Sequence, residues 1–256
     1  MSSVFKLELF TVLSLLLVSF ALFLTHRFVK PERRKYCYLI ASLGCIIIHF
    51  SDYVIDLING TAGEVPSNLF LPEWPCNVIM WMSLAISIML FFKDNYVRKY
   101  LLYISFWVGT VCTVIGIAGN FNFLDNPSFS DWGIMKGLLS HVFLVYCCLY
   151  PASEKMVGYN FIRITFSMLI TDLLFIGCGT FSQKMHLLLG RDPGGTMLDP
   201  PFETMPWLGL HVILILTTVL WVIGATIYET IKFPRGDRWY SHLDEIMDDL
   251  RGAEEQ

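Results

Sequence analysis

Apolar and polar positions alternate along the chain in long blocks. Seven of these blocks are almost wholly apolar, and each is long enough, at roughly 17 to 25 residues, to cross a bilayer as a helix. They cover Leu9–Thr25, Tyr36–Ile58, Cys76–Phe92, Leu101–Ala118, Ile134–Tyr150, Phe161–Phe181 and Trp207–Tyr228. The pattern predicts an all-α membrane protein, a seven-transmembrane helix bundle.

The basic residues between the blocks predict the orientation of this bundle, because short cytoplasmic loops are enriched in lysine and arginine. Most of the 18 Lys and Arg residues follow the first, third, fifth and seventh blocks. We therefore expect the N-terminus outside the cell or in a lumen, and the C-terminus in the cytoplasm. Residues 1–232 would form the transmembrane domain and residues 233–256 an acidic cytoplasmic tail. In that tail, the spacing of Trp239, Leu243, Ile246 and Leu250 allows a short amphipathic helix.

Composition agrees with a multi-pass membrane protein. Hydrophobic residues make up 55% of the 256 residues, charged residues 16%, and the mean hydropathy is +0.57. A soluble domain carries about 25% charged residues. The net charge of -4 gives no indication of a nucleic-acid partner. The membrane would be the plasma membrane in a bacterium, and the endoplasmic reticulum or another endomembrane in a eukaryote.

Titratable residues inside the apolar blocks are candidates for function, because charged groups are costly in lipid unless they face the bundle interior. His49, Asp52 and Asp56 are three and four residues apart, so they share one helix face. Three others lie in later blocks: His141, Asp172 and His211. We expect the three histidines and Asp52 to line one cavity in the outer half of the bundle. The alternative is a polar seam that joins helices by hydrogen bonds.

Cys76 differs from the other cysteines because it opens an apolar block. It follows Pro75, which suits the first position of a helix. Cys76 would then lie in the first turn, where the helix dipole favours a thiolate. A reactive thiol is one interpretation, and an ordinary small apolar residue at a helix start is the other. We expect Cys76 and Cys178 to be unbridged, as a nucleophile requires.

Short motifs between about Asn59 and Ile227 carry a resemblance to a known family. The motifs are Pro75-Cys76, Ser140-His141-Val142 and Met197-Leu198-x-Pro200, followed by a tryptophan-containing block with His211. Together they resemble the YwaF-type integral membrane family. That family includes a mammalian cysteine-dependent acyltransferase that places acyl chains on ether phospholipids.

The resemblance implies a catalytic cysteine and a catalytic histidine, which correspond to Cys76 and His141. The chain also departs from the family pattern. Asn77 stands where the mammalian relative has histidine, and Trp74 stands where bacterial members often have histidine. Gly195-Thr196 replaces a pair of asparagines. These differences bear on the identity of the substrate.

The residues and the resemblance together predict a lipid acyltransferase that works through a cysteine thioester, with membrane phospholipids as acyl donor and acceptor. Cys76 would be the nucleophile and His141 the general base. Asp52 or Asp172 would orient the imidazole. Asn77, or the N–H groups at the helix start, would stabilise the oxyanion. The reaction requires no metal ion or other cofactor.

Two other functions stay open from the residues alone. A proton-coupled transporter would use a relay of intramembrane groups: His49, Asp52, His141 and Asp172. A seven-helix zinc-dependent lipid hydrolase would use a ligand set drawn from His49, Asp52, His141 and His211. No pair of histidines shares one helix, which disfavours the zinc site.

Overall fold

The computed structural model describes residues 2–61, 71–190 and 209–242, and within these ranges the chain forms helices and no strand. The α-helices are α1 (Ser3–Phe28), α2 (Pro31–Asn59), α3 (Pro75–Met89), α4 (Tyr96–Ile104), α5 (Thr110–Ala118), α6 (Phe121–Asp125), α7 (Trp132–Ser153), α8 (Phe161–Leu188) and α9 (Leu210–Lys232). A π-helical turn, η2 (Ser105–Gly109), joins α4 to α5.

Six stretches of the described chain are long and apolar enough to cross a membrane: Ser3–Phe28, Pro31–Asn59, Tyr96–Asp125, Trp132–Ser153, Phe161–Leu188 and Val212–Lys232. The third predicted block corresponds to α3, a shorter apolar helix of 15 residues. The predicted all-helical membrane fold is therefore confirmed in its class. Residues before 209 in the last predicted block lie outside the described residues.

Prolines and glycine set the ends of the early helices. Pro31 and Pro75 open α2 and α3 at positions where a missing N–H costs nothing. Gly60 ends α2 with a φ of 69°, a left-handed conformation that other residues adopt only with strain. Asn and Asp side chains cap later helices by accepting first-turn N–H groups, as Asp131 does from Ile134 at the start of α7.

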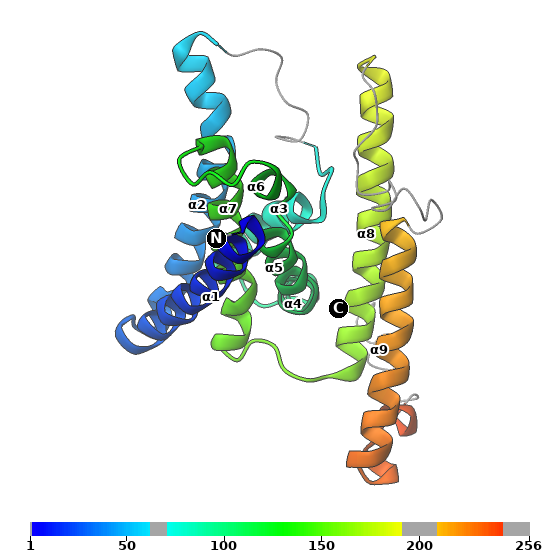
Figure 1. Ribbon diagram of the computed structural model, residues 1–256. Coiled ribbons are helices and arrows are strands. Elements are labelled where there is room, and N and C mark those ends of the chain that lie inside the picture. The colour runs from blue at the N-terminus through cyan, green and yellow to red at the C-terminus, as the bar shows by residue number, and fades with distance from the viewer. Residues whose placement is uncertain (1, 62–70, 191–208, 243–256) are drawn as a thin grey trace.

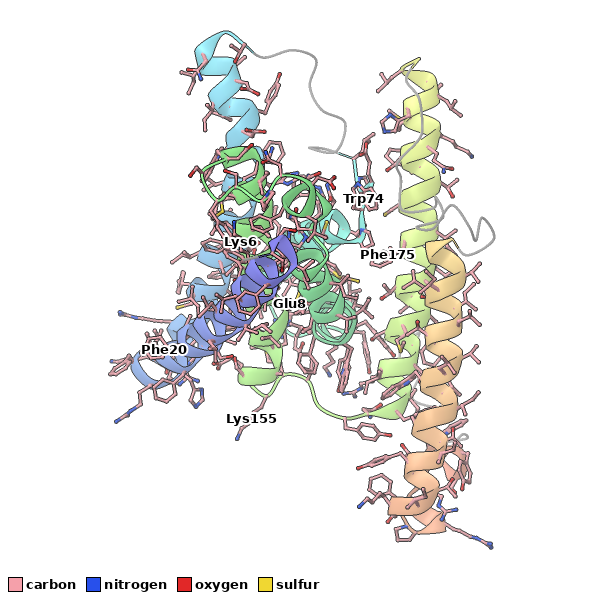
Figure 2. The ribbon with its side chains drawn as sticks, viewed as in Figure 1. Lys6, Glu8, Phe20, Trp74, Lys155 and Phe175 are labelled. Atoms are coloured by element: carbon pink, nitrogen blue, oxygen red, sulfur yellow. The ribbon has the colours of Figure 1, made fainter. Side chains whose placement is uncertain are left out.

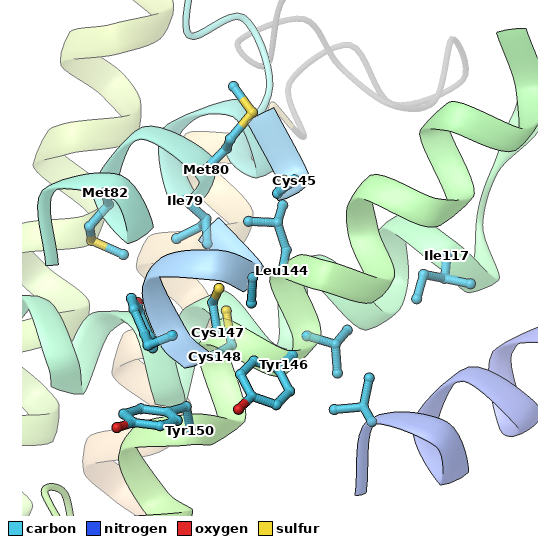
Figure 3. Close-up of a cluster of buried hydrophobic side chains, with 14 of the residues drawn as sticks. Cys45, Ile79, Met80, Met82, Ile117, Leu144, Tyr146, Cys147, Cys148 and Tyr150 are labelled. Carbon is cyan, nitrogen blue, oxygen red and sulfur yellow. The ribbon is translucent and has the colours of Figure 1, made fainter. Parts of the chain in front are cut away.

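The central helix of the bundle is α7, which packs against α1, α2, α3 and α5 (Figure 1). Its inward side chains lie in the main hydrophobic core together with residues of α2 and α3 (Figure 3). Leu138, Cys147 and Cys148 are fully buried there. Because α7 contacts several other helices, its side chains can meet residues from distant segments of the chain.

Helices α8 and α9 form a hairpin at one side of the bundle (Figure 1). Phe175 of α8 is buried on the side that faces the bundle, whereas Phe20 of α1 points outward (Figure 2). Large apolar side chains also cover the outer faces of the hairpin, for example Leu173 and Leu220. Such faces suit contact with lipid.

The beginning of the tail folds back onto the hairpin. The Trp239 ring stacks on Phe161 with ring centroids 4.5 Å apart, and its Nε1 donates to the hydroxyl of Thr226 at 3.1 Å. Glu229, which is buried, accepts hydrogen bonds from the Trp239 backbone and from the Tyr159 hydroxyl. The remainder of the proposed amphipathic helix, from Leu243 onward, lies outside the described residues.

Gly109, at the end of the π-helical turn, explains how α3 and α7 approach the α4–α5 run so closely. A Cβ atom on Gly109 would lie 2.8 Å from Sγ of Cys148 and 3.3 Å from a side-chain carbon of Ile79. The sequence predicted one uniform helix over this stretch. The π-helical turn was not predicted, because apolar periodicity does not distinguish it from α-helix.

We expect Ile79→Ala to destabilise the protein by about 2 kcal/mol, since Ile79 is fully buried and its truncation leaves a cavity among α3, α7 and η2. Ile88→Ala on the same helix is the control, because Ile88 is 52% exposed. Thermal unfolding in detergent measures both. Equal effects of the two substitutions would contradict this packing of α3.

Candidate active site

A cavity of about 260 Å³ opens between α2, α3, α7 and the start of α6. Its walls combine polar groups with apolar side chains: Cys45, His49, Trp74, Cys76, Asn77, Met80, Asn120, Asn122, Gly133, Lys136, Gly137, Ser140, His141 and Leu144. Cys76 and His141, which are 65 positions apart in the chain, therefore face the same space.

The Cys76 thiol has two polar neighbours. The His141 imidazole lies in the same cavity wall, close enough to interact with it. Its Sγ also lies 3.4 Å from Oδ1 of Asn77, in geometry that lets the thiol donate. A thiol has one proton, so it donates to one of these acceptors at a time. For the sulfur to act as a nucleophile, the thiol proton must go to the imidazole and not stay bonded to the Asn77 oxygen.

The imidazole of His141 is oriented by the backbone of its own helix. Nδ1 lies 2.6 Å from the carbonyl oxygen of Gly137. A carbonyl oxygen only accepts, so Nδ1 carries a proton. In the neutral ring Nε2 then bears the lone pair. This is the tautomer that a general base beside a thiol requires, because Nε2 is the nitrogen left to receive the thiol proton.

Gly116 of α5 holds the other edge of this ring in place. A Cβ atom built on Gly116 would lie 2.4 Å from both Cδ2 and Nε2 of His141. The ring therefore rests directly on the glycine backbone, and no larger residue fits without moving it. Nothing in the sequence indicates that Gly116 belongs to the site. Its contact with a catalytic candidate is decided by how α5 and α7 are rotated.

Asn77 is buried beside the sulfur, with 6% of its surface exposed. The backbone N–H groups of Asn77 and Val78 both donate to the carbonyl of Trp74, at 3.0 and 3.3 Å. Those two N–H groups are therefore not available to an oxyanion, contrary to part of one expectation. The N–H group of Cys76 itself and the Asn77 carboxamide, which contacts Sγ through Oδ1, remain candidates.

The three titratable residues that were predicted to share one face of α2 lie in different environments. His49 lines the cavity. Asp52 instead accepts from Lys136, whose Nζ lies 2.6 Å from Oδ2. Asp56 is exposed near the end of α2. Of the three, only His49 lies in the wall beside Cys76 and His141.

Asp172 lies away from the cavity wall, in the α8–α9 hairpin. It is buried and accepts from the Thr218 hydroxyl at 3.1 Å. The hypothesis that Asp52 or Asp172 orients His141 is therefore wrong, because the Gly137 carbonyl has that role. His211 lies in the first turn of α9, but its side chain is outside the described residues.

A buried pair fixes the segment that leads into α3. Nε2 of His186 lies 2.7 Å from Oε1 of Glu73, and both residues are buried. This contact ties the chain three residues before Cys76 to the far end of α8. This contact was not predicted from the sequence, because the predicted sixth block ended at Phe181, whereas α8 continues to Leu188.

Three further polar residues of the cavity were not predicted from the sequence: Lys136, Asn120 and Asn122. Lys136 is positioned four residues before Ser140, so the two are neighbours along α7. This four-residue spacing is the sequence feature that could have indicated Lys136 as a neighbour of the Ser140-His141 motif. The asparagines belong to the turn that begins α6, and nothing in their local sequence indicates the cavity.

All seven cysteines are free, so Cys76 and Cys178 are not bridged. Within the described residues, no three His, Cys, Asp or Glu side chains converge in a way that could hold a metal ion. His49, Asp52 and His141 accordingly do not form a three-ligand cluster. A comparison of the chain with protein-family models, curated proteins and solved structures found no match.

Gly116→Ala is expected to displace the His141 ring and to slow alkylation of Cys76 by iodoacetamide by about 10²-fold, the scale of a 1 Å misplacement in a catalytic pair. Gly177→Ala is the matched control, since no heavy atom lies within 4 Å of a Cβ built there. Peptide mass spectrometry measures the alkylation of Cys76 over time. An unchanged rate in Gly116→Ala would mean that His141 does not activate this thiol.

Proposed function

We propose that this protein is an integral membrane lipid acyltransferase in which Cys76 is the nucleophile and His141 the general base. The single observation that carries the proposal is that the Cys76 thiol and the His141 imidazole lie together in one cavity wall, with Nδ1 of His141 held by the Gly137 carbonyl. A thiol with an acceptor nitrogen beside it is the arrangement that covalent acyl transfer uses. The resemblance to the YwaF-type family, which rests on the motifs around the same two residues, points to the same chemistry.

In the first half-reaction, Nε2 of His141 takes the thiol proton and the sulfur attacks the carbonyl carbon of a lipid ester. The tetrahedral intermediate collapses as the ester C–O bond breaks, and the imidazolium gives its proton to the leaving alkoxide. The products are an acyl thioester on Cys76 and a lipid with a free hydroxyl. Asn77 is positioned beside the sulfur, and its Nδ2 amino group is the part of the carboxamide that can donate to the developing oxyanion.

In the second half-reaction, a hydroxyl of an acceptor lipid attacks the thioester. His141 removes the hydroxyl proton, the C–S bond breaks, and the proton returns to the sulfur. Water in place of the lipid hydroxyl would give hydrolysis instead. The partly apolar wall with Met80 and Leu144 favours transfer, because it limits water around the thioester.

The transporter alternative has less support. Its relay requires Asp172 close to His141, but Asp172 bonds with Thr218 of α9 and does not line the cavity. Asp52, another member of the relay, is paired with Lys136. Acyl transfer needs only the pair that does meet.

We propose further that α3 is a seventh crossing, with the N-terminus outside or lumenal. At 15 residues, α3 spans about 22 Å, less than the roughly 30 Å of a bilayer core. A helix that begins below the membrane surface has less than the full bilayer thickness left to cross. Such a start is supported by α2 and α8, which both extend past the level at which α3 begins (Figure 1). The distribution of lysine and arginine supports the orientation.

Cys76→Ser should abolish the acyl adduct, and His141→Ala should slow its formation by about 10²-fold or more, the scale for loss of a general base. Mass spectrometry of protein incubated with phospholipid vesicles measures the adduct on Cys76. Cys178→Ser is the control, because it removes a partly buried thiol outside the cavity. Continued acyl transfer by a folded Cys76→Ser protein would rule out the mechanism.

Epitope tags inserted after Gly60 and after Asn126 should be accessible from the same side of the membrane, and a tag after Gly158 from the opposite side. This follows if α3 crosses, because an even number of crossings then separates residues 60 and 126. Protease protection in sealed vesicles measures the sidedness of each tag. Opposite sides for the first two tags would show that α3 does not cross.

A further inference from the structure

Lys136 is the only Lys, Arg, Asp or Glu among the described residues that line the cavity. Its side chain is one quarter exposed. The other polar wall groups include the carboxamides of Asn120 and Asn122, which can donate hydrogen bonds. No carboxylate side chain belongs to this described wall, so the formal charge of its surface is positive.

Asp52 supplies the counter-charge from outside the wall, with its Oδ2 2.6 Å from Nζ. A charged group next to lipid needs such a partner, because an unpaired charge there is costly. An ammonium has three N–H donors, and Asp52 accepts one of them. Lys136 can therefore be held in position by α2 and still donate to an anion in the cavity.

The helix provides space for that anion. Gly133 and Gly137, on either side of Lys136 along α7, both line the cavity and carry no side chain. Lys136 lies nearer the start of α7, and His141 follows five residues later, about 7.5 Å along the axis. A ligand along this wall therefore meets the ammonium first and the Cys76–His141 pair deeper in the bundle.

We propose that Lys136 binds the phosphate of a glycerophospholipid while the acyl ester of the same lipid lies at Cys76. The ammonium of Lys136 and the Cys76–His141 pair follow one another along the cavity wall. The phosphate and the ester carbonyl follow one another in the same way in such a lipid, where only the glycerol unit separates them. The cavity, at about 260 Å³, accommodates this polar region and not the whole lipid. The proposal rests on the acyltransferase function and adds the residue that recognises the phosphate of the phospholipid donor.

The test compares two acyl donors with identical chains, phosphatidylcholine and diacylglycerol, by the rate of adduct formation on Cys76. Wild-type protein should prefer phosphatidylcholine by about tenfold or more, the value of one charge-assisted hydrogen bond. Lys136→Gln should lose most of this preference through a higher KM for phosphatidylcholine. Lys136→Arg should keep it, as should Lys184→Gln, which removes an exposed lysine of α8 outside the cavity.

The outcomes separate this proposal from the function on which it rests. Absence of an adduct with both donors in the wild type would overturn the acyltransferase mechanism itself. Equal rates for the two donors in the wild type, with an adduct on Cys76, would overturn only the phosphate site, even if Lys136→Gln failed to fold. Equal rates for the two donors together with inhibition by inorganic phosphate that disappears in Lys136→Gln would assign the site to free phosphate instead of a lipid headgroup.

Discussion

The hydrogen bond from Nδ1 of His141 to the Gly137 carbonyl determines what the cavity can do. It is local, because it joins residues four apart on one helix, where side chains point back toward the preceding turn. It nonetheless sets the tautomer, and the tautomer decides whether the nitrogen facing Cys76 accepts or donates a proton. The same pair with the opposite tautomer would have no acceptor for the thiol proton.

The surrounding contacts preserve that geometry. Gly116 leaves room for the Cδ2–Nε2 edge of the ring, and Cys76 lines the same cavity as the ring. Asp52 and Lys136 tie α2 to α7 at a nearby level of the bundle. In an environment with little water, each polar group must find its partner within the protein. The hydrogen-bonding groups around the cavity therefore constrain the rotation of the helices as well as the chemistry.

The position of the sulfur depends on a different contact. The pair Glu73 and His186 joins the segment before α3 to the end of α8. Because Cys76 follows Glu73 by three residues, this pair limits how far the sulfur can move away from the bundle. The side hairpin of α8 and α9 thus contributes to the site through α8, although Asp172, a buried carboxyl group of that helix, does not line the cavity.

The sequence by itself determined the helical membrane fold and the start of α3, because a bilayer requires long apolar helices and Pro75 favours a first helical position. It also indicated Cys76 and His141 as candidate site residues. Only the tertiary structure decided that Gly137 orients His141, that Gly116 supports its ring and that Lys136 pairs with Asp52. These contacts depend on the rotation and depth of each helix. Apolar blocks cannot encode either, since lipid accepts an apolar residue on every face.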